Sequence, residues 1–183
     1  MLTTKTPVEA FDAFVQQPEN ADKLYEYVGG EIVEVPSNPY ASKISQIISG
    51  EIYAFLKGKN LGHLTGEAGG YIVSGERYAP DVAFISNVKQ LRLVSEGYNP
   101  NPPDLAVEVD IPSTYSSQRI LFTKTVNYLA AGTVVWLVLP ERKEVEVYVP
   151  GAPKRTLGVD AVLDGGDALP GFQFAVKNIF PDE

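Results

Sequence analysis

Apolar and polar residues alternate along several short stretches of this chain, and the alternation predicts β-strands. In residues 144–149 every second residue is valine, which is typical of a strand with one face in solvent. The run Val134–Leu139 is apolar throughout and therefore indicates a strand that is covered on both faces. In residues 25–35 two strand-like stretches flank Gly29-Gly30, a pair that accepts positive φ, so a hairpin is predicted there.

Three other stretches have the residue spacing of helices. The sequence Thr6-Pro7-Val8-Glu9 has the form of a capped helix start and predicts a helix that ends near Gln17. Residues 117–131 predict another helix, which Gly132 ends as a C-terminal cap. Residues 41–57 predict the most regular helix, because their apolar positions recur every three or four residues: Ile44, Ile47, Ile48, Ile52, Phe55 and Leu56.

Two further predicted strands, in residues 79–85 and 104–110, carry acidic residues. Successive side chains of a strand point to opposite faces, so Glu108 and Asp110 should emerge on the same side. Asp81 stands at the start of the other strand. If the two strands are neighbours, three carboxylates converge and repel one another unless a positive group lies among them. A hard divalent cation such as Mg²⁺ would suit, since it binds one or two carboxylates and keeps several waters.

A plainer interpretation of these acids is equally compatible with their residue types. Asp81 could be a turn residue and Glu108 could lie on the solvent side of a half-exposed strand, because acidic residues are usually exposed unless they are paired. The neighbouring residues favour central, buried strands, since they leave little polar surface: Ala83, Phe84, Ile85, Ala106 and Val107.

A lysine lies within the apolar stripe of the predicted helix that follows the Glu108 strand. Lys124 is four residues from both Ile120 and Tyr128, and with Leu121 these positions should face the core. In one interpretation the Lys124 stem simply snorkels to the edge of the sheet. In the other its ammonium reaches the carboxylates, where it could orient an attacking water and stabilise charge on a phosphoryl oxygen. Arg119 lies on a more exposed part of the helix and is ranked lower.

The predicted elements and the composition indicate one soluble domain over residues 1–183. Strands mixed with helices favour an α/β or α+β fold with a mixed central sheet. There are no cysteines, and the single histidine, His63, excludes a multi-histidine zinc site within one chain. No apolar run is long enough to span a bilayer and the start lacks a signal pattern, so a cytoplasmic protein without membrane attachment is expected.

Five segments, taken in order, resemble the Uma-two family, whose members are described as endonucleases on the PD-(D/E)XK restriction-endonuclease-like fold. The segments are Tyr25-Glu-Tyr-Val-Gly-Gly-Glu31-Ile-Val, Ala79-Pro-Asp81-Val-Ala-Phe, Pro103-Asp-Leu-Ala-Val-Glu108-Val, Lys124-Thr-Val-Asn-Tyr128-Leu-Ala-Ala-Gly-Thr-Val-Val-Trp136-Leu-Val, and the tail Leu163-Asp-Gly-Gly-Asp-Ala-Leu-Pro-Gly-Phe172 with Ile179-Phe180. The resemblance covers nearly the whole chain. It implies a restriction-endonuclease-like core with an extra N-terminal hairpin and short C-terminal strands.

The resemblance also implies roles for particular residues in a Mg²⁺- or Mn²⁺-dependent endonuclease acting on DNA. Asp81 and Glu108 correspond to the metal-binding carboxylates, and Lys124 looks like the replacement for a lysine that usually follows the second acid. Glu31 matches a recurrent early acid that would complete the site. Asp110 occupies the position where the plain fold motif carries that lysine, and it is either a further metal ligand or a solvated acid. A second departure is Ala41, at a place where family members often have histidine.

The net charge of −8 bears on the choice between function classes. Non-specific affinity for nucleic acid is mostly neutralisation of phosphates by Lys and Arg, so an acidic chain argues against it. The alternative is a catalytically inactive interaction or regulatory module that keeps the fold and forms a homodimer. A homodimer is also expected for the nuclease, because a partner would help an acidic protein to act on duplex DNA. A glycosidase with paired carboxylates is poorly supported, since nothing resembles an aromatic sugar platform.

Overall fold

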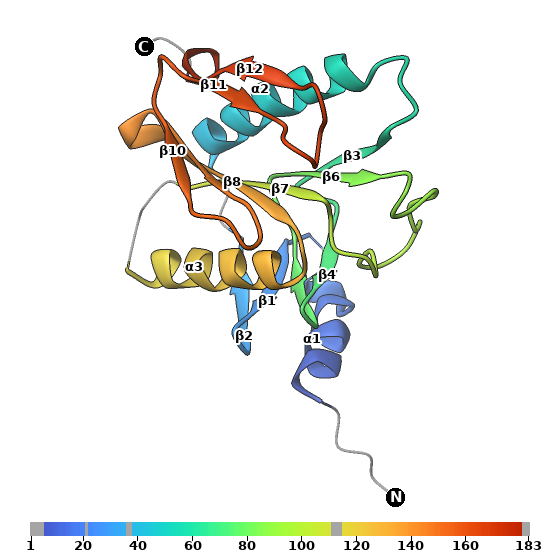
Figure 1. The fold of residues 1–183 in the computed structure, drawn as a ribbon. Helices are drawn as coiled ribbons and strands as arrows, with labels where there is room; N and C mark the ends of the chain where they lie inside the picture. Colours follow the sequence, from blue (N-terminus) through green and yellow to red (C-terminus); the bar gives the residue numbers. More distant parts are fainter. Residues whose placement is uncertain (1–5, 21, 36–37, 111–114, 181–183) are drawn as a thin grey trace, which may run out of the picture.

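The computed structural model describes residues 6–20, 22–35, 38–110 and 115–180, with the side chains of residues 115–117 left out (Figure 1). Its largest sheet has the strand order β10-β9-β8-β7-β6-β3, and a smaller sheet has the order β2-β1-β5-β4. The strands of the large sheet are β3 (Gly62–Gly66), β6 (Val82–Ser86), β7 (Leu105–Val109), β8 (Val134–Leu139), β9 (Glu144–Tyr148) and β10 (Arg155–Leu157). Those of the small sheet are β1 (Tyr25–Val28), β2 (Glu31–Glu34), β4 (Tyr71–Val73) and β5 (Glu76–Tyr78), and β11 (Val162–Asp164) pairs with β12 (Gln173–Ala175). The helices are α1 (Pro7–Val15), α2 (Pro39–Leu56) and α3 (Tyr115–Ala130), with 3-10 turns η1 (Pro18–Asn20), η2 (Pro140–Arg142) and η3 (Val176–Asn178).

The large sheet is mixed, because β7 and β8 are parallel whereas its other described pairs are antiparallel. A parallel pair needs a crossover connection, and α3 supplies it between β7 and β8. This crossover places α3 against one face of the sheet, and every second side chain of β7 points toward that face.

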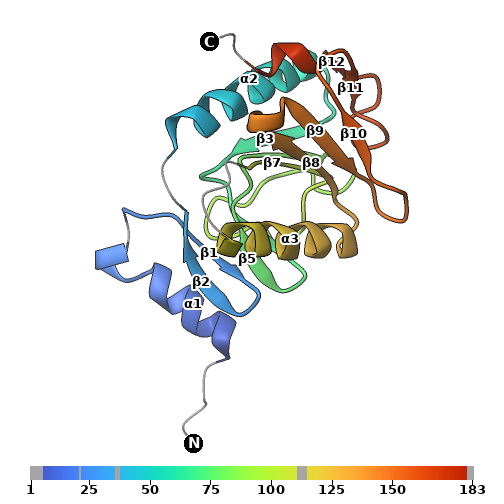
Figure 2. The ribbon, with the colours of Figure 1, turned by 90° about the vertical axis from the view of Figure 1, so that its left-hand side faces the viewer.

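The two faces of the large sheet are covered by different elements (Figures 1 and 2). On one face α2 packs with the β11–β12 hairpin, and Ile48 lies in the same buried cluster as Phe84, Val107 and Trp136. The other face is covered by α3 and the small sheet, and the buried residues there include Val28, Tyr71, Tyr78, Ala83, Ala106 and Tyr128. Even and odd positions of β6 and β7 therefore belong to separate cores.

An N-terminal cap and a proline set the start of helix α2. Asn38 is the N-terminal cap, and its Oδ1 accepts hydrogen bonds from the backbone N–H groups of Tyr40 (3.0 Å) and Ala41 (3.1 Å). Pro39 occupies the first turn, where its missing N–H costs nothing. This cap explains why the helix starts at Pro39, two residues before the start predicted from apolar spacing.

The fold class predicted from the sequence is confirmed, including the N-terminal hairpin, the mixed sheet and the short C-terminal strands. Two details differ. Helix α1 ends at Val15, because the chain turns into η1 at Pro18. The glycine-broken segment 62–78 is divided between the sheets, since β3 joins β6 at the edge of the large sheet while the β4–β5 hairpin joins β1. Within the described residues, no helix is long and apolar enough to cross a membrane.

Removing apolar volume beneath α2 should destabilise the protein. Ile48 is fully buried, so Ile48→Ala should lower the free energy of unfolding by about 2–5 kcal/mol, through lost burial and the cavity that remains. Tyr53, on the same helix, is 65% exposed and provides the matched control, because Tyr53→Ala should change stability by only about 0.5 kcal/mol. Urea denaturation measures both variants, and equal losses would contradict the assignment of the buried face.

Candidate active site

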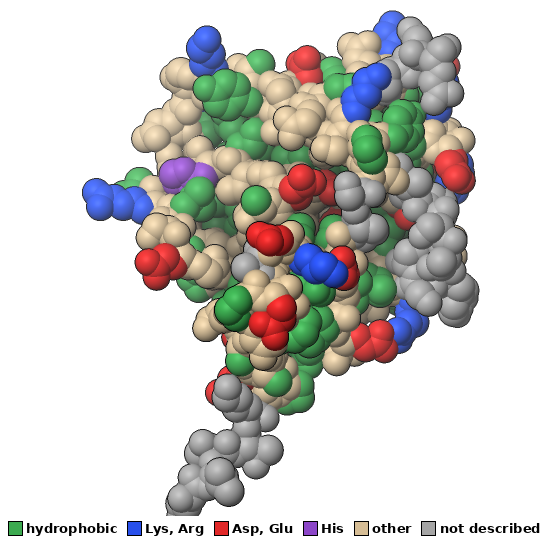
Figure 3. Space-filling model, turned by 180° about the vertical axis from the view of Figure 1, so that it is seen from behind, with side chains coloured by type: hydrophobic (Ala, Val, Ile, Leu, Met, Phe, Trp, Pro, Cys, Tyr) green, Lys and Arg blue, Asp and Glu red, His purple; other side chains and the backbone are tan. Residues whose placement is uncertain are grey.

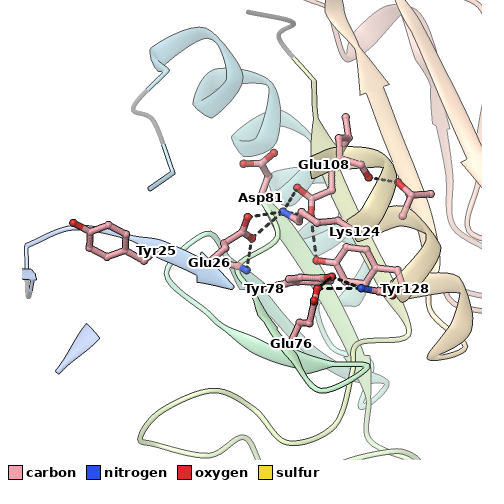
Figure 4. A network of polar contacts seen from close by, with 12 residues as sticks. Tyr25, Glu26, Glu76, Tyr78, Asp81, Glu108, Lys124 and Tyr128 are labelled. Atoms are coloured by element: carbon pink, nitrogen blue, oxygen red, sulfur yellow. Dashed lines mark hydrogen bonds and ion pairs between the residues drawn. The ribbon is translucent and has the colours of Figure 1, made fainter. Parts of the chain in front are cut away.

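A buried lysine lies between two buried glutamates at the centre of the molecule (Figure 4). Lys124 Nζ, from the middle of α3, lies 2.8 Å from Glu26 Oε1 and 3.1 Å from Glu26 Oε2. The same atom lies 2.8 Å from Glu108 Oε1 and 2.9 Å from Glu108 Oε2. Only 6% of the Lys124 side chain is exposed. The lysine in the apolar stripe of this helix therefore does not snorkel to the surface but reaches the carboxylates.

Glu26 is positioned by the alternation of strand β1. Its neighbours Tyr25 and Tyr27 point to the opposite face, where their rings contact Phe14 and Phe11 of α1 at centroid distances of 5.0 Å and 5.7 Å. Glu26 consequently faces the large sheet, and its Oε1 also accepts a hydrogen bond of 2.7 Å from the backbone N–H of Ala79. The small sheet thus delivers one acid to a site otherwise built from the large sheet and α3.

Asp81 and Glu108 come together because β6 and β7 are antiparallel neighbours. Val82 pairs with Val107, so the next position on each strand brings Asp81 opposite Glu108 on the face that α3 covers. The Asp81 Oδ2 atom accepts a hydrogen bond of 2.7 Å from the backbone N–H of Val109. Asp81 Oδ1 has no hydrogen bond to another residue in the described part of the chain. Of the three acids predicted to converge from neighbouring strands, Asp81 and Glu108 do so.

Two tyrosines surround the charged groups. Tyr128, one helical turn after Lys124 and fully buried, donates a hydrogen bond of 3.0 Å to Glu108 Oε1. The ring centroid of Tyr78 lies 5.7 Å from Lys124 Nζ. The Tyr78 hydroxyl in turn donates a hydrogen bond to the Glu76 carboxylate and accepts one from the side-chain amide of Asn127. These contacts fix the rotamers of Glu108 and Lys124 from both sides of the cluster.

Burial and mutual repulsion shift the ionisation of the acidic groups. Burial raises the pKa of Glu108 to about 8. The charge of Lys124 lowers this pKa, but burial together with the neighbouring acids Glu26 and Asp81 outweighs that effect. Burial likewise raises the pKa of Asp81, against the hydrogen bond from Val109 and the charge of Lys124. Burial alone would lower the pKa of the Lys124 ammonium, but Glu108 and Glu26 outweigh it and raise that pKa above its ordinary value. At neutral pH the cluster therefore combines a charged Lys124 with a Glu108 carboxyl group that readily takes up a proton.

A cavity of about 540 Å³ lies at the start of α2 and meets the cluster at Asp81. Ala41 also lines this cavity. The remaining lining residues come from the chain before β1, the end of the hairpin, the start of α2 and the turn after β3: Asp22, Lys23, Leu24, Val35, Asn38, Pro39, Ser42, Glu67 and Ala68. We name this space the Asp81 cavity. Asp81 is thus the member of the cluster through which a ligand in the cavity would meet the buried charges.

Two acids predicted for the site lie away from the cluster. Glu31 begins β2 at the tip of the hairpin, where its side chain is 56% exposed and forms a bidentate ion pair of 2.9 Å with Arg119. It is Glu26, five residues earlier, that lies in the cluster. Asp110 follows the end of β7 and lines a separate cavity with Glu141 and Arg142. Burial and the charge of Glu141 raise the pKa of Asp110, against the charge of Arg142. Its carboxylate is not among the groups that contact Lys124.

His63, the single histidine of the chain, does not take part in the cluster. His63 lies on the edge strand β3, and its Nε2 is 3.1 Å from the carbonyl oxygen of Leu91. No three or more His, Cys, Asp or Glu side chains in the described ranges form a ready-made metal cage. Lys124 therefore occupies the central position among the acids of the cluster.

Sequence reasoning missed Glu26 and Tyr128, although each left a signal. Glu26 stands between Tyr25 and Tyr27 in a short strand. Because successive side chains of a strand point to opposite faces, Glu26 must face away from the two tyrosines. Tyr128 belongs to the same apolar stripe as Lys124, and this pattern predicts only that it packs in the core. A buried tyrosine hydroxyl usually finds a hydrogen-bond partner, and Glu108 is that partner.

The raised pKa of Glu108 predicts how stability depends on pH. Between the ordinary carboxyl pKa of roughly 4.5 and about 8, the folded state binds more protons than the unfolded state, so stability should fall as pH rises through this range. Glu108→Gln removes the titrating group and should flatten the free energy of unfolding between pH 5 and pH 8, measured by urea denaturation. Glu31→Gln, at an exposed acid, is the control and should leave the slope unchanged. A wild-type stability that rises over this range would contradict the prediction.

Comparisons with known proteins agree with this architecture. A solved structure from Anabaena variabilis ATCC 29413, described as a "putative nuclease belonging to DUF820", is similar with a TM-score of 0.76 and 20% sequence identity. The similarity covers 92% of this chain and 96% of that chain, and at such an identity it shows the fold alone. The curated proteins include no match. A model of the Uma2 family, described as "Putative restriction endonuclease", matches residues 11–177. The chain therefore belongs to the Uma2 family of restriction-endonuclease-like proteins.

Proposed function

We propose that this protein is a metal-dependent nuclease that hydrolyses phosphodiester bonds of DNA. The observation that carries the proposal is the meeting of Glu108, Glu26 and Lys124 with Asp81, which lines the Asp81 cavity. Buried acids that repel one another are costly for stability, and such groups are concentrated at functional sites. Membership of the Uma2 family supports the same reaction class.

The chemistry of the acids fits a hard divalent cation. Mg²⁺ and Mn²⁺ prefer oxygen ligands, and Mg²⁺ commonly binds one or two carboxylates while keeping several waters. Asp81 and Glu108 would hold the ion, because they are adjacent and Asp81 Oδ1 has no hydrogen-bond partner in the described part of the chain. When bound, such an ion polarises a phosphoryl oxygen and lowers the pKa of a bound water.

The other residues of the cluster would position the reacting groups. Lys124 carries a fixed positive charge at the carboxylates, so its ammonium can orient the attacking water and offset negative charge that develops on the phosphate. Glu26 holds Lys124 from the side of the small sheet, while Tyr128 binds Glu108 Oε1. These contacts restrict the rotamers before substrate binds, which reduces the cost of assembling the site.

Isosteric replacement of either proposed metal-binding acid should greatly slow cation-dependent cleavage. Asp81→Asn keeps an oxygen for the Val109 N–H, and Glu108→Gln keeps one for Tyr128, so both variants should fold. Each should lower the rate of oligonucleotide cleavage in Mg²⁺ or Mn²⁺ by about 10²–10³-fold, as is typical when one electrostatic stabiliser is lost. Glu31→Gln should cleave as wild type does. Unchanged cleavage in both Asp81→Asn and Glu108→Gln would rule the proposal out.

Cation binding should compete with protons in this site. Because the pKa of Glu108 is raised to about 8, a cation must compete with its proton, so affinity for Mn²⁺ should increase between pH 6 and pH 8.5. Calorimetry in buffers of different ionisation enthalpy measures both the affinity and the protons released. Glu108→Gln should weaken binding and release fewer protons. An affinity that does not vary with pH would show that these carboxylates are not the ligands.

A further inference from the structure

A second, smaller cavity of about 200 Å³ adjoins the Asp81 cavity. The two share Ala68, in the turn after β3, as a common wall. The smaller cavity is bounded by that turn, by Tyr71 at the start of β4, and by the loop that precedes β7. Its lining residues are Thr65, Ala68, Gly69, Gly70, Tyr71, Leu93, Val94, Ser95, Gly97 and Asn99. We name it the Val94 cavity.

The walls of the Val94 cavity combine an apolar side with exposed backbone. Leu93 and Val94 are both partly exposed on their loop, although nothing in the described core requires them there. Gly70 cannot carry a side chain, because a Cβ atom would come 2.4 Å from the Tyr98 ring, so the backbone itself forms the lining at this position. Such a surface suits a flat, weakly polar group with hydrogen-bonding edges.

The surroundings of both cavities are poor in available positive charge. The Asp81 cavity is lined by Asp22, Glu67 and Asp81, and its one basic residue, Lys23, is bound to Glu34 at 2.9 Å. Figure 3 shows acidic side chains around the middle of one face of the molecule, with basic side chains mostly toward its edges. Long duplex DNA is held mainly by many phosphate contacts to Lys and Arg, and Lys23 is the one basic residue among the described residues that line the two cavities.

We propose that the Val94 cavity binds an unpaired nucleobase next to the phosphate that is cleaved, so that the substrate is single-stranded rather than duplex DNA. This inference rests on the proposed function, because the Asp81 cavity must receive the phosphate. Pockets for drug-sized ligands occupy roughly 300–1,000 Å³, so a cavity of 200 Å³ suits one base rather than a whole nucleotide. A base enters such a pocket only when it is unpaired and unstacked. One anchored base would replace the affinity that phosphate contacts do not supply.

The test fills the Val94 cavity and compares the result with an equal change outside it. Val94→Trp places a large ring among the lining residues, whereas Val88→Trp adds the same ring to the same loop at a residue that is 99% exposed and lines neither cavity. Wild-type protein with Mn²⁺ should cleave a single-stranded oligonucleotide at least about tenfold faster than the blunt duplex of the same sequence. Val94→Trp should lower kcat/KM on the single strand by about tenfold or more, while Val88→Trp should not change it.

Further readouts separate failure of this inference from failure of the proposed function. Calorimetry should give Val94→Trp the wild-type affinity for Mn²⁺, because Val94 does not contact the carboxylates. Equal cleavage of duplex and single strand, with Val94→Trp behaving as wild type, would overturn the nucleobase site and leave the nuclease intact. If no substrate is cleaved, fluorescence anisotropy with a labelled single strand decides. Weaker binding by Val94→Trp than by Val88→Trp supports the site, and equal binding overturns it.

Discussion

The contact of Lys124 with Glu26 and Glu108 is the interaction on which the arrangement of this molecule depends. A buried ammonium needs a buried counter-charge, and here it has two, from different sheets. Because Glu26 comes from β1, Glu108 from β7 and Lys124 from α3, the ion pairs join the small sheet, the large sheet and the crossover helix at one point. Removing one partner from such a cluster typically costs about 3–5 kcal/mol, because the remaining charges stay buried.

This dependence gives the N-terminal hairpin a role beyond covering the sheet. The hairpin strand β1 presents tyrosines to α1 on one face and Glu26 to Lys124 on the other, so the packing of α1 and the position of Glu26 are set by one strand. The hydrogen bond from Ala79 to Glu26 then connects the hairpin to the segment that carries Asp81. A change in the packing of α1 against Tyr25 and Tyr27 would therefore reach the charged cluster through Glu26, the residue between them on β1.

The residues that local patterns could identify were those whose partners are near in sequence or in register. The parity of β7 places Glu108 toward α3, and the apolar stripe of α3 places Lys124 toward β7, so their meeting follows from two adjoining elements. The alternation of β1 indicates only that Glu26 faces away from the two tyrosines, because its meeting with Lys124 depends on β1 joining β5 in a second sheet, a long-range pairing that no local pattern specifies. Glu31 lies on the same hairpin but at its tip, where solvent and Arg119 are available. Asp110 shares parity with Glu108, yet it lies past the end of the strand, where parity no longer decides direction.

The charge balance of the cluster argues that it is kept for a ligand rather than for stability. Three carboxylates face one ammonium, so full ionisation would leave an excess of negative charge in a space that water hardly reaches. The raised pKa of Glu108 shows how the protein alone relieves this excess, by taking up a proton near neutral pH. An apolar replacement of similar volume would avoid the cost altogether. A cation at Asp81 would relieve it without a proton, and the open side of the cluster is the side that Asp81 presents to the cavity.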